Sequence, residues 1–355
     1  MSLPQAKLLE YLKAVKNNDN KSNETPGLDC AVVKSKIPGY YSISTTDFFY
    51  PLIDDPYLQG RIAACNVISD MYAMGVIEID TMLMILGVCR EMPEKERDYS
   101  TREMIRGFND IAHIAATNVT GGQTVMNEWP MIGGVATSIS KEPKIKGLPC
   151  DYDGSIPNED EEGDFIWPDR GEAGDVLILT KPIGTQAAVN TFEWIRKPAS
   201  WANIEDIMTY DDIIKTYKMA CDSMSFPNLI GAQLMRKYHA HGCTDITGFG
   251  IYGHTNNLAE QQRNKINLII KRLPVIVNML TVNDYLHDKF RFHTGLSAES
   301  SGGLMIMLPP QYAESYLKEY KELTGHEAWI VGEVVEGENK SILDKDMELF
   351  EVEEW

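Results

Sequence analysis

Apolar positions in this chain repeat with the period of a helix in some segments and with that of a strand in others. Gly75 directly follows the longest helical pattern, where a glycine commonly ends a helix. The pair Gly121-Gly122 is expected to interrupt the chain before the next strand. The patterns predict helices over residues 4–16, 56–74, 101–117, 185–194, 210–223, 229–239, 252–261 and 312–323. They predict strands over residues 28–33, 41–46, 81–88, 131–137, 176–180, 268–270, 303–308 and 328–335.

Residues 141–174 differ from both flanks and divide the chain. This segment contains several prolines and glycines and an acidic run at residues 158–164, which is typical of a linker or surface insertion. Helices and strands alternate on each side of it, and a length of 355 residues favours two domains. We therefore predict an α/β (α+β) fold with an N-terminal domain over residues 1–170 and a C-terminal domain over residues 175–355.

The composition of the chain argues against some classes of binding partner. The net charge of -19 opposes binding to nucleic acid and to anionic lipid, and it means that a nucleotide site here needs local cations. No apolar run is long enough for a membrane span, and the start of the chain does not read as a signal peptide. The six cysteines include no Cys-x-x-Cys pair. A cytoplasmic enzyme that binds neither nucleic acid nor membrane is the expectation.

Four aspartates occupy unusual positions in the predicted pattern. Asp29 begins a strand, Asp47 ends one, Asp70 lies inside an apolar helix, and Asp245 precedes a glycine-rich turn. A carboxylate among apolar residues is costly to bury unless it is paired or binds a metal, and Mg²⁺ prefers such oxygen ligands. Each aspartate taken alone is equally explained as a helix cap or a turn residue. Spacing along the chain does not show whether the four converge.

Two glycine-rich segments are candidates for binding phosphate. Residues 120–124, Thr-Gly-Gly-Gln-Thr, could present successive backbone N–H groups to an anion, or could simply form a turn that enters a strand. Residues 248–253 match Gly-x-Gly-x-x-Gly, but the residues before them make a poor strand and no acidic residue lies about 20 positions beyond. We therefore reject a dinucleotide site there and expect only a glycine-rich helix start.

Several short motifs occur together along the chain: Thr-Thr-Asp-Phe-Phe at residues 45–49, Ser-Asp-Met-Tyr-Ala-Met-Gly at residues 69–75, Asn66, and residues 54–57, 60–63, 120–124, 179–185, 244–250 and 297–303. In these motifs the sequence resembles the selenophosphate synthetases (selenide, water dikinases), most closely those of eukaryotes. The resemblance implies a two-domain fold of the aminoimidazole-ribonucleotide-synthetase type, which dimerises through its N-terminal domains. It also implies formation of selenophosphate, AMP and phosphate from ATP, selenide and water.

The resemblance also assigns roles to individual residues and names the partners. It implies Mg²⁺ as the cofactor, ATP and selenide as substrates, and a homodimer. The metal ligands it implies are Asp29, Asp70 and Asp245. The ATP-binding positions it implies are Gly27, Leu28, Asp29, Asp47, Asp70, Gly121, Gly122, Gln123 and Thr124.

The start of the chain departs from the family pattern. The family carries a glycine-rich segment with a reactive cysteine or selenocysteine and a nearby lysine just before a Pro-Gln helix start. Here Pro4-Gln5 matches that helix start and only residues 1–3 precede it, so no catalytic residue is assigned in this chain. We expect a truncated form that is inactive as it stands. The alternatives are a non-catalytic, ATP-binding paralogue with a regulatory role and another enzyme of the same superfamily.

Overall fold

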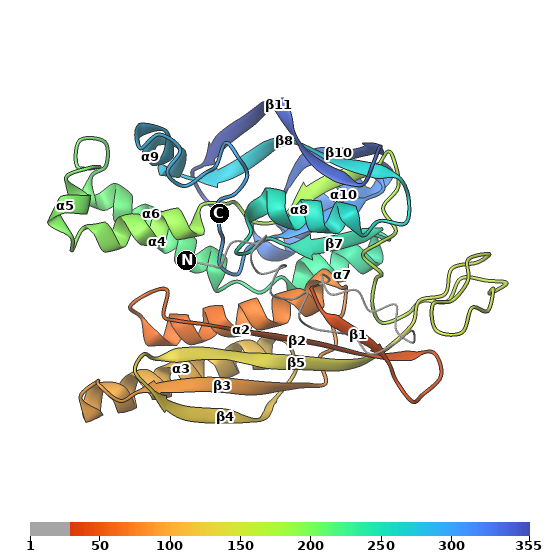
Figure 1. Cartoon of the computed structure of the whole chain (residues 1–355), viewed down its shortest axis with the longest axis horizontal. Coiled ribbons are helices and arrows are strands. Elements are labelled where there is room, and N and C mark those ends of the chain that lie inside the picture. The colour runs from red at the N-terminus through yellow and green to blue at the C-terminus, as the bar shows by residue number, and fades with distance from the viewer. Residues whose placement is uncertain (1–28) are drawn as a thin grey trace.

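A computed structural model describes residues 29–355 of the chain (Figure 1). The helix predicted over residues 4–16 lies outside the described residues, as do Gly27 and Leu28. The described part is built from two mixed sheets, one on each side of the segment 142–175. The predicted α/β class is therefore confirmed.

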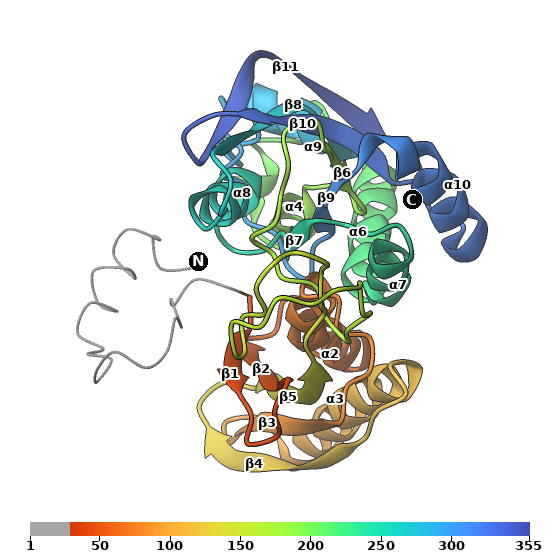
Figure 2. The same cartoon turned by 90° about the vertical axis from the view of Figure 1, so that its right-hand side faces the viewer.

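The first sheet has five strands in the order β1-β2-β5-β3-β4. Only β3 and β4 pair in parallel; the other neighbours are antiparallel. Two helices, α2 and α3, lie on the same side of the sheet, and the opposite side carries no helix of the described residues (Figure 2). The strands are β1 (Ala31–Lys34), β2 (Tyr40–Phe49), β3 (Thr81–Cys89), β4 (Val119–Asn127) and β5 (Met131–Lys141), and the helices are α2 (Pro56–Ala73) and α3 (Glu94–Ile114).

Helix α2 connects the two halves of the molecule. Its start is set by Asp55, whose side chain accepts hydrogen bonds from the N–H groups of Tyr57 and Leu58 at 2.8 and 3.0 Å. It ends before Gly75, which has a φ of +69°. Between these ends it is buried on nearly all sides, because it packs on β2, β5 and α3 below and on β7, α6 and α7 above (Figure 1).

The second sheet has six strands in the order β11-β8-β10-β6-β9-β7. Its strands β7 and β9 are buried throughout. Its strands are β6 (Val176–Leu179), β7 (Gly242–Asp245), β8 (Ile266–Ile276), β9 (Leu304–Leu308), β10 (Trp329–Glu336) and β11 (Lys340–Val352). The helices around it are α4 (Thr185–Trp194), α5 (Pro198–Trp201), α6 (Tyr210–Met224), α7 (Leu229–Lys237), α8 (Gly250–Glu260), α9 (Met279–Tyr285), the short 3₁₀ helix η1 (Pro310–Tyr312) and α10 (Ala313–Thr324).

The segment 142–175 runs from the last strand of the first sheet to the first strand of the second. It consists of turns and one isolated bridge between Lys144 and Glu161, and part of it projects from the body (Figure 1). Ion pairs tie it back to the second half, because Arg263 pairs with Asp151 at 3.0 Å and with Asp169 at 2.7 Å, and Arg236 pairs with Glu162 at 3.0 Å. The segment is thus a loop anchored at several points of the second domain.

Several predicted elements need correction. Gly121-Gly122 does not interrupt the chain, because both residues lie within β4 and pair with β3. Helix α3 begins at Glu94 instead of residue 101, since its first turns are charged and exposed and so lack an apolar period. The residues before Gly248 do form a strand, β7, and β11 was not predicted because its many charged positions hide the strand period.

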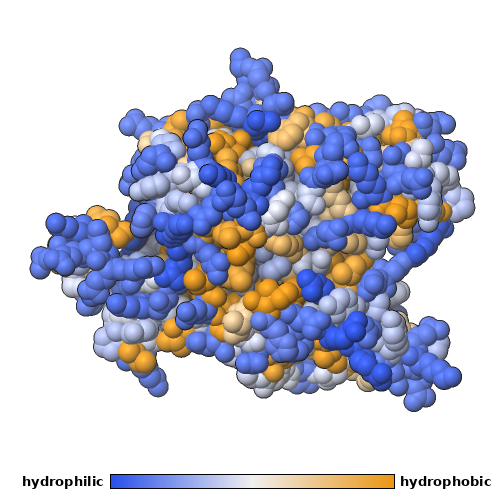
Figure 3. Space-filling view, turned by 180° about the vertical axis from the view of Figure 1, so that it is seen from behind, coloured by the Kyte–Doolittle hydropathy of each residue, from blue (hydrophilic) through white to orange (hydrophobic). Residues whose placement is uncertain are grey.

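The surface agrees with the composition. On the face opposite to that of Figure 1, hydrophilic side chains cover the periphery and apolar ones gather toward the middle (Figure 3). Among residues 29–355, no helix combines the length and the apolar character needed to cross a membrane.

Candidate functional site

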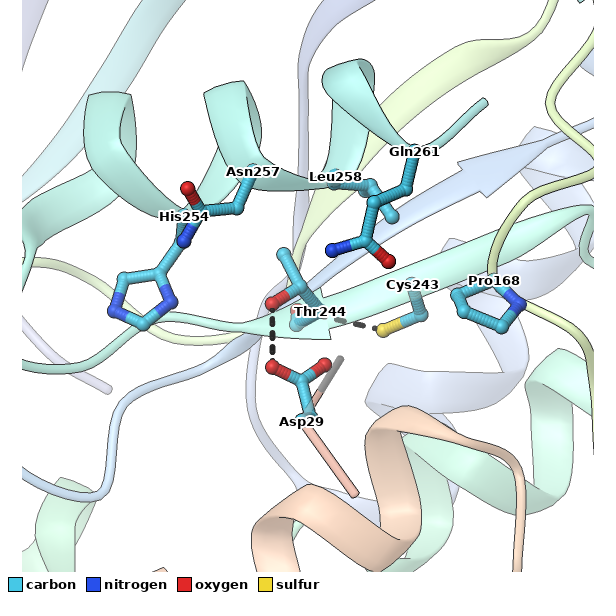
Figure 4. Close-up of a pocket in the computed structure, with 8 residues that line it drawn as sticks. All are labelled: Asp29, Pro168, Cys243, Thr244, His254, Asn257, Leu258 and Gln261. Carbon is cyan, nitrogen blue, oxygen red and sulfur yellow. Dashed lines mark hydrogen bonds between the residues drawn. The ribbon is translucent and has the colours of Figure 1, made fainter. Parts of the chain in front are cut away.

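The first element of the site is a contact between the two domains. Asp29 lies just before β1, and Thr244 lies on β7 of the other sheet (Figure 4). The hydroxyl of Thr244 donates a hydrogen bond of 3.0 Å to Oδ1 of Asp29. Asp245, the last residue of β7, is also close to Asp29, because ligand atoms of the two side chains lie within 4.8 Å of each other. Two carboxylates from distant parts of the chain therefore meet at the contact between the two domains.

The second element is a pair of carboxylates on the first domain. Asp47 is on β2 and Asp70 is near the end of α2, which covers that strand. The hydroxyl of Thr45 donates a short hydrogen bond to Oδ2 of Asp70, and Nδ2 of Asn66 donates to Oδ2 of Asp47 at 3.1 Å. Residues 45–49, Asn66 and residues 69–75, which the resemblance singled out, thus contain these two side chains and the groups that hold them in place.

The electrostatic interactions between the two pairs of carboxylates indicate that they form one cluster. Burial raises the pKa of Asp47 to about 7 and that of Asp245 to about 6, and it raises the pKa values of Asp29 and Asp70 well above their usual range. Repulsion from Asp245 adds to the effect at the other three positions. Such crowding of buried carboxylates disfavours their charged forms unless a cation is bound among them.

Asp245 supplies a direct sign that a cation fits. Its side chain is 1% exposed, and among residues 29–355 its Oδ2 has no hydrogen-bond partner, although Ser69 hydrogen-bonds the same carboxylate and lowers its pKa. A buried acceptor without a partner is rare in folded proteins and calls for an ion or a water molecule. Oxygen donors of this kind are what Mg²⁺ prefers, so the residues present fit a divalent cation.

His254, in the second turn of α8, is a site residue that sequence reasoning missed. One of its ring nitrogens lies within 4.8 Å of carboxylate oxygens of both Asp29 and Asp245. Burial lowers the pKa of His254 to about 4, so the ring is neutral, and its Nε2 accepts a hydrogen bond of 3.3 Å from the backbone N–H of Phe249. A single histidine in a helical pattern gives no signal of such a role. The pocket beside it is lined by Asp29, Pro168, Cys243, Thr244, His254, Asn257, Leu258 and Gln261 (Figure 4).

Lys181 is a buried lysine whose charge acts on Asp245. It follows β6, is 1% exposed, and donates to the carbonyl oxygens of Phe226 at 2.7 Å and Ser301 at 2.9 Å. Burial lowers its pKa to about 8, while its charge lowers the pKa of Asp245. It lies in the motif at residues 179–185, but no feature of that motif singles out this lysine.

The remaining predicted nucleotide positions lie elsewhere. Residues Gly121 to Thr124 are on β4, the exposed edge of the first sheet, and β4 is separated from β2 by β5 and β3. At about 4.8 Å per strand this is about 14 Å, so the segment and the carboxylate cluster do not meet within one chain. The nest or entry turn expected there is instead an extended edge strand. Gly27 and Leu28 lie outside the described residues.

The comparisons with known proteins agree with this geometry. The family "AIR synthase related protein" matches in two parts, its N-terminal domain over residues 27–139 and its C-terminal domain over residues 172–345. The solved structure of AaThiL complexed with AMPPCP and TMP is 17% identical, with a TM-score of 0.64 over 97% of this chain and 95% of its own, so the fold is shared. The class is thus a two-domain protein of the AIR-synthase type.

Comparison with curated relatives identifies the family within this class. A selenide, water dikinase of Dictyostelium discoideum is 41% identical over 99% of this chain and 91% of its own length. Selenide, water dikinase 2 of Homo sapiens is 44% identical over 90% of this chain and 67% of its own. The chain belongs to the selenide, water dikinase family, as the motifs predicted.

Proposed function

We propose that this chain forms selenophosphate, AMP and phosphate from ATP, selenide and water. The observation that carries the proposal is the meeting of Asp29, Asp47, Asp70 and Asp245 between the two domains, with one buried oxygen of Asp245 left without a partner in the part of the chain that the structure describes. The names of the relatives and the AMPPCP complex of a protein with the same fold support it.

Magnesium–ATP would occupy the space at this cluster. Asp29, Asp70 and Asp245 would hold Mg²⁺, and bound cations would neutralise the charge that develops on the phosphates. A chain of net charge -19 repels ATP elsewhere on its surface, so local cations decide where the triphosphate binds.

The residues around the cluster would position its acidic groups. Thr244 orients Asp29 and Thr45 orients Asp70 through their hydroxyl groups. Asn66 orients Asp47 through its side-chain amide. Lys181 supplies a fixed positive charge next to Asp245 and favours its ionised form. These contacts prepare the carboxylates for a cation before it arrives.

A second copy of the chain would supply residues 121–124. The strand register places Phe48, Leu83 and Val125 on the side of the first sheet that no described helix covers, and they are 54%, 38% and 52% exposed. An apolar sheet face of this kind next to an unpaired edge strand is typical of an interface. We propose that two chains pair through it, so that Gly121 to Thr124 of one contribute to the nucleotide site of the other.

Three finer expectations stay predictions. The domain boundary is placed at residues 170–175, and the protein is placed in the cytoplasm. The expectation that the chain is inactive without a reactive segment before Pro4 is tested by assaying it beside a chain that carries such a segment. ATP binding without any selenide-dependent product from either chain would favour the alternative of a non-catalytic paralogue.

The decisive experiment follows products from ATP and selenide by phosphorus NMR. Asp245→Asn should abolish formation of selenophosphate and AMP in the chain with the reactive segment, because the cluster then loses an anionic ligand. The matched control is Asp346→Asn, whose carboxylate is 81% exposed and far along β11. Equal activity of the two variants would refute the proposed site.

A further inference from the structure

The ring of His254 is held by one of its nitrogens and presents the other to the pocket. Its Nε2 accepts a hydrogen bond of 3.3 Å from the backbone N–H of Phe249, and it is 3.1 Å from the hydroxyl of Thr247. A neutral imidazole carries one proton, so a ring that accepts at Nε2 carries that proton on Nδ1. The contact with Phe249 therefore makes Nδ1 the donor of this ring.

The Nδ1–H group is a buried donor without an acceptor. In Figure 4 one ring nitrogen faces Thr244 and Asp29 and the other turns away from them, so the nitrogen that faces the pocket is Nδ1. A ring nitrogen lies within 4.8 Å of oxygens of both Asp29 and Asp245, yet among residues 29–355 no hydrogen bond joins the ring to either carboxylate. The side chain is only 8% exposed. A buried donor of this kind indicates a ligand that accepts from it.

The charges beside the ring indicate what that ligand is. Asp29 and Asp245 repel a free anion, but Mg²⁺ held by carboxylates brings the phosphate oxygens of its nucleotide with it. A hydrogen bond from nitrogen to oxygen spans about 2.7–3.2 Å, so a phosphate oxygen can lie between the ring and the carboxylates. We propose that the Nδ1–H of His254 donates a hydrogen bond to a phosphate oxygen of magnesium-bound ATP. The inference rests on the proposed function for the place of the nucleotide.

A neutral donor suits this position better than a charged one. A lysine or arginine here would pair with the carboxylates and compete with the cation for them. Burial lowers the pKa of His254 to about 4, so the ring stays uncharged at neutral pH. The imidazole can therefore donate to a phosphate oxygen without neutralising the carboxylates that hold the cation.

Two substitutions give opposite expectations for a binding role and a structural role. The side-chain amide of His254→Gln can reach the place of Nε2 and accept from Phe249, but it leaves no donor at Nδ1. The amide of His254→Asn can place a donor at Nδ1, but it leaves the N–H of Phe249 without its acceptor. If the ring binds phosphate, Gln should weaken the binding of magnesium–AMPPCP by at least about tenfold and Asn by less than about threefold. If the ring only supports Phe249, the order is reversed.

Isothermal titration with magnesium–AMPPCP measures these affinities, and thermal unfolding shows whether each variant folds. The matched controls are His113→Gln and His113→Asn, at an exposed position of α3. Both controls should bind magnesium–AMPPCP as the parent chain does. An affinity that is preserved in His254→Gln, or that is lower in His254→Asn than in His254→Gln, would overturn the inference.

Nitrogen NMR of protein grown with ¹⁵N-histidine tests the parent chain without any substitution. One of the seven histidines should show a protonated Nδ1 and an unprotonated Nε2, and its signals should be absent from His254→Gln. Magnesium–AMPPCP should change the Nδ1 shift and slow the exchange of its proton with water. Mg²⁺ alone is the control and should have a smaller effect, since it brings only exchangeable water to the ring. A ring protonated on Nε2, or an Nδ1 signal that does not respond to AMPPCP, would overturn the inference.

The outcomes separate this inference from the proposed function. Selenophosphate formation that depends on Asp245 could continue in a protein whose His254 makes no contact with phosphate. Conversely, AMPPCP binding that depends on the Nδ1 donor, in a protein that forms no selenophosphate, would support the assignment of His254 and refute the proposed reaction.

Discussion

The side-chain oxygen of Asn66 accepts a hydrogen bond of 3.0 Å from the backbone N–H of Ser301, across the boundary between the two domains. The same amide donates to Asp47 at 3.1 Å, so one side chain ties the domain contact to the carboxylate cluster. Ser301 has a φ of +47°, an unusual conformation for a residue other than glycine, and its carbonyl accepts from Lys181. The cluster therefore depends on how the domains are docked.

Replacing Asn66 with alanine should destabilise the protein. The buried N–H of Ser301 would lose its acceptor, which costs about 1–3 kcal/mol, and Asp47 would lose a donor that fixes its orientation. Urea unfolding measures the change in the free energy of unfolding. Asn109→Ala, at a partly exposed position of α3, is the control. Equal stability of the two variants would contradict the importance of this contact.

The cluster should make stability depend on pH and on divalent cations. Asp residues titrate near 3.9 in an unfolded chain. In the folded protein burial raises the pKa of Asp245 to about 6 and that of Asp47 to about 7. At pH values between the unfolded pKa and these folded pKa values, the folded state binds more protons than the unfolded state does. The free energy of unfolding therefore falls as pH rises through that range. In EDTA, urea unfolding should give a lower free energy at about pH 7.5 than at about pH 5, and Mg²⁺ should reduce the difference.

Asp245→Asn is the control for this pH effect. It removes one carboxylate from the cluster, so the fall in stability with pH should become smaller and the response to Mg²⁺ weaker. The comparison with the parent chain subtracts the contribution of the acidic surface, which is the same in both. An unchanged pH profile in the variant would show that these carboxylates are not the source.

The two adjacent glycines of β4 should respond differently to alanine. At Gly122, which has a φ of +146°, an added Cβ would lie 1.9 Å from the carbonyl oxygen of Met84 on β3. At Gly121 it would meet only the side chain of Leu83, at 3.5 Å. Gly122→Ala should therefore disrupt the β3–β4 pair and lower the thermal unfolding temperature, and Gly121→Ala should not.

The same pair of variants tests whether residues 121–124 contact ATP in the proposed dimer. Gly121→Ala keeps the strand, so any loss of nucleotide affinity in it reports contact between this segment and ATP. Isothermal titration with magnesium–ATP and a measurement of molecular mass in solution follow the two properties. A Gly121→Ala protein that is dimeric and binds ATP as the parent does would argue against a phosphate-binding role for residues 121–124.

Lys181→Met should be strongly destabilising. The buried carbonyl of Ser301 would lose its donor, at about 1–3 kcal/mol, and the partly buried carbonyl of Phe226 would lose the same donor. Loss of the ammonium should also raise the pKa of Asp245 further, since Lys181 lowers it. Urea unfolding at neutral pH compares it with Lys218→Met at an exposed position of α6. A variant as stable as the control would show that the two carbonyls find other donors.

Elements with a strong local period could be predicted closely from the sequence. Helix α2, strand β3 and helix α4 lie where predicted, because their apolar spacing and terminal residues are properties of neighbouring positions. Strands β4, β7 and β11 were missed or rejected. Their sequences contain glycines, charges or only a few residues, and pairing with a partner strand makes them extended.

The sequence by itself determined the family and named the aspartates, since motifs are read along the chain. Only the tertiary structure decided that Asp29 meets Thr244, 215 positions away, and that Asp245 brings His254 into the same cluster. It also separated residues 121–124 from that cluster by placing them on the far edge of the sheet. The physical reason is that a cation site is defined by distances between side chains, and those distances follow from the packing of whole sheets and not from spacing along the chain.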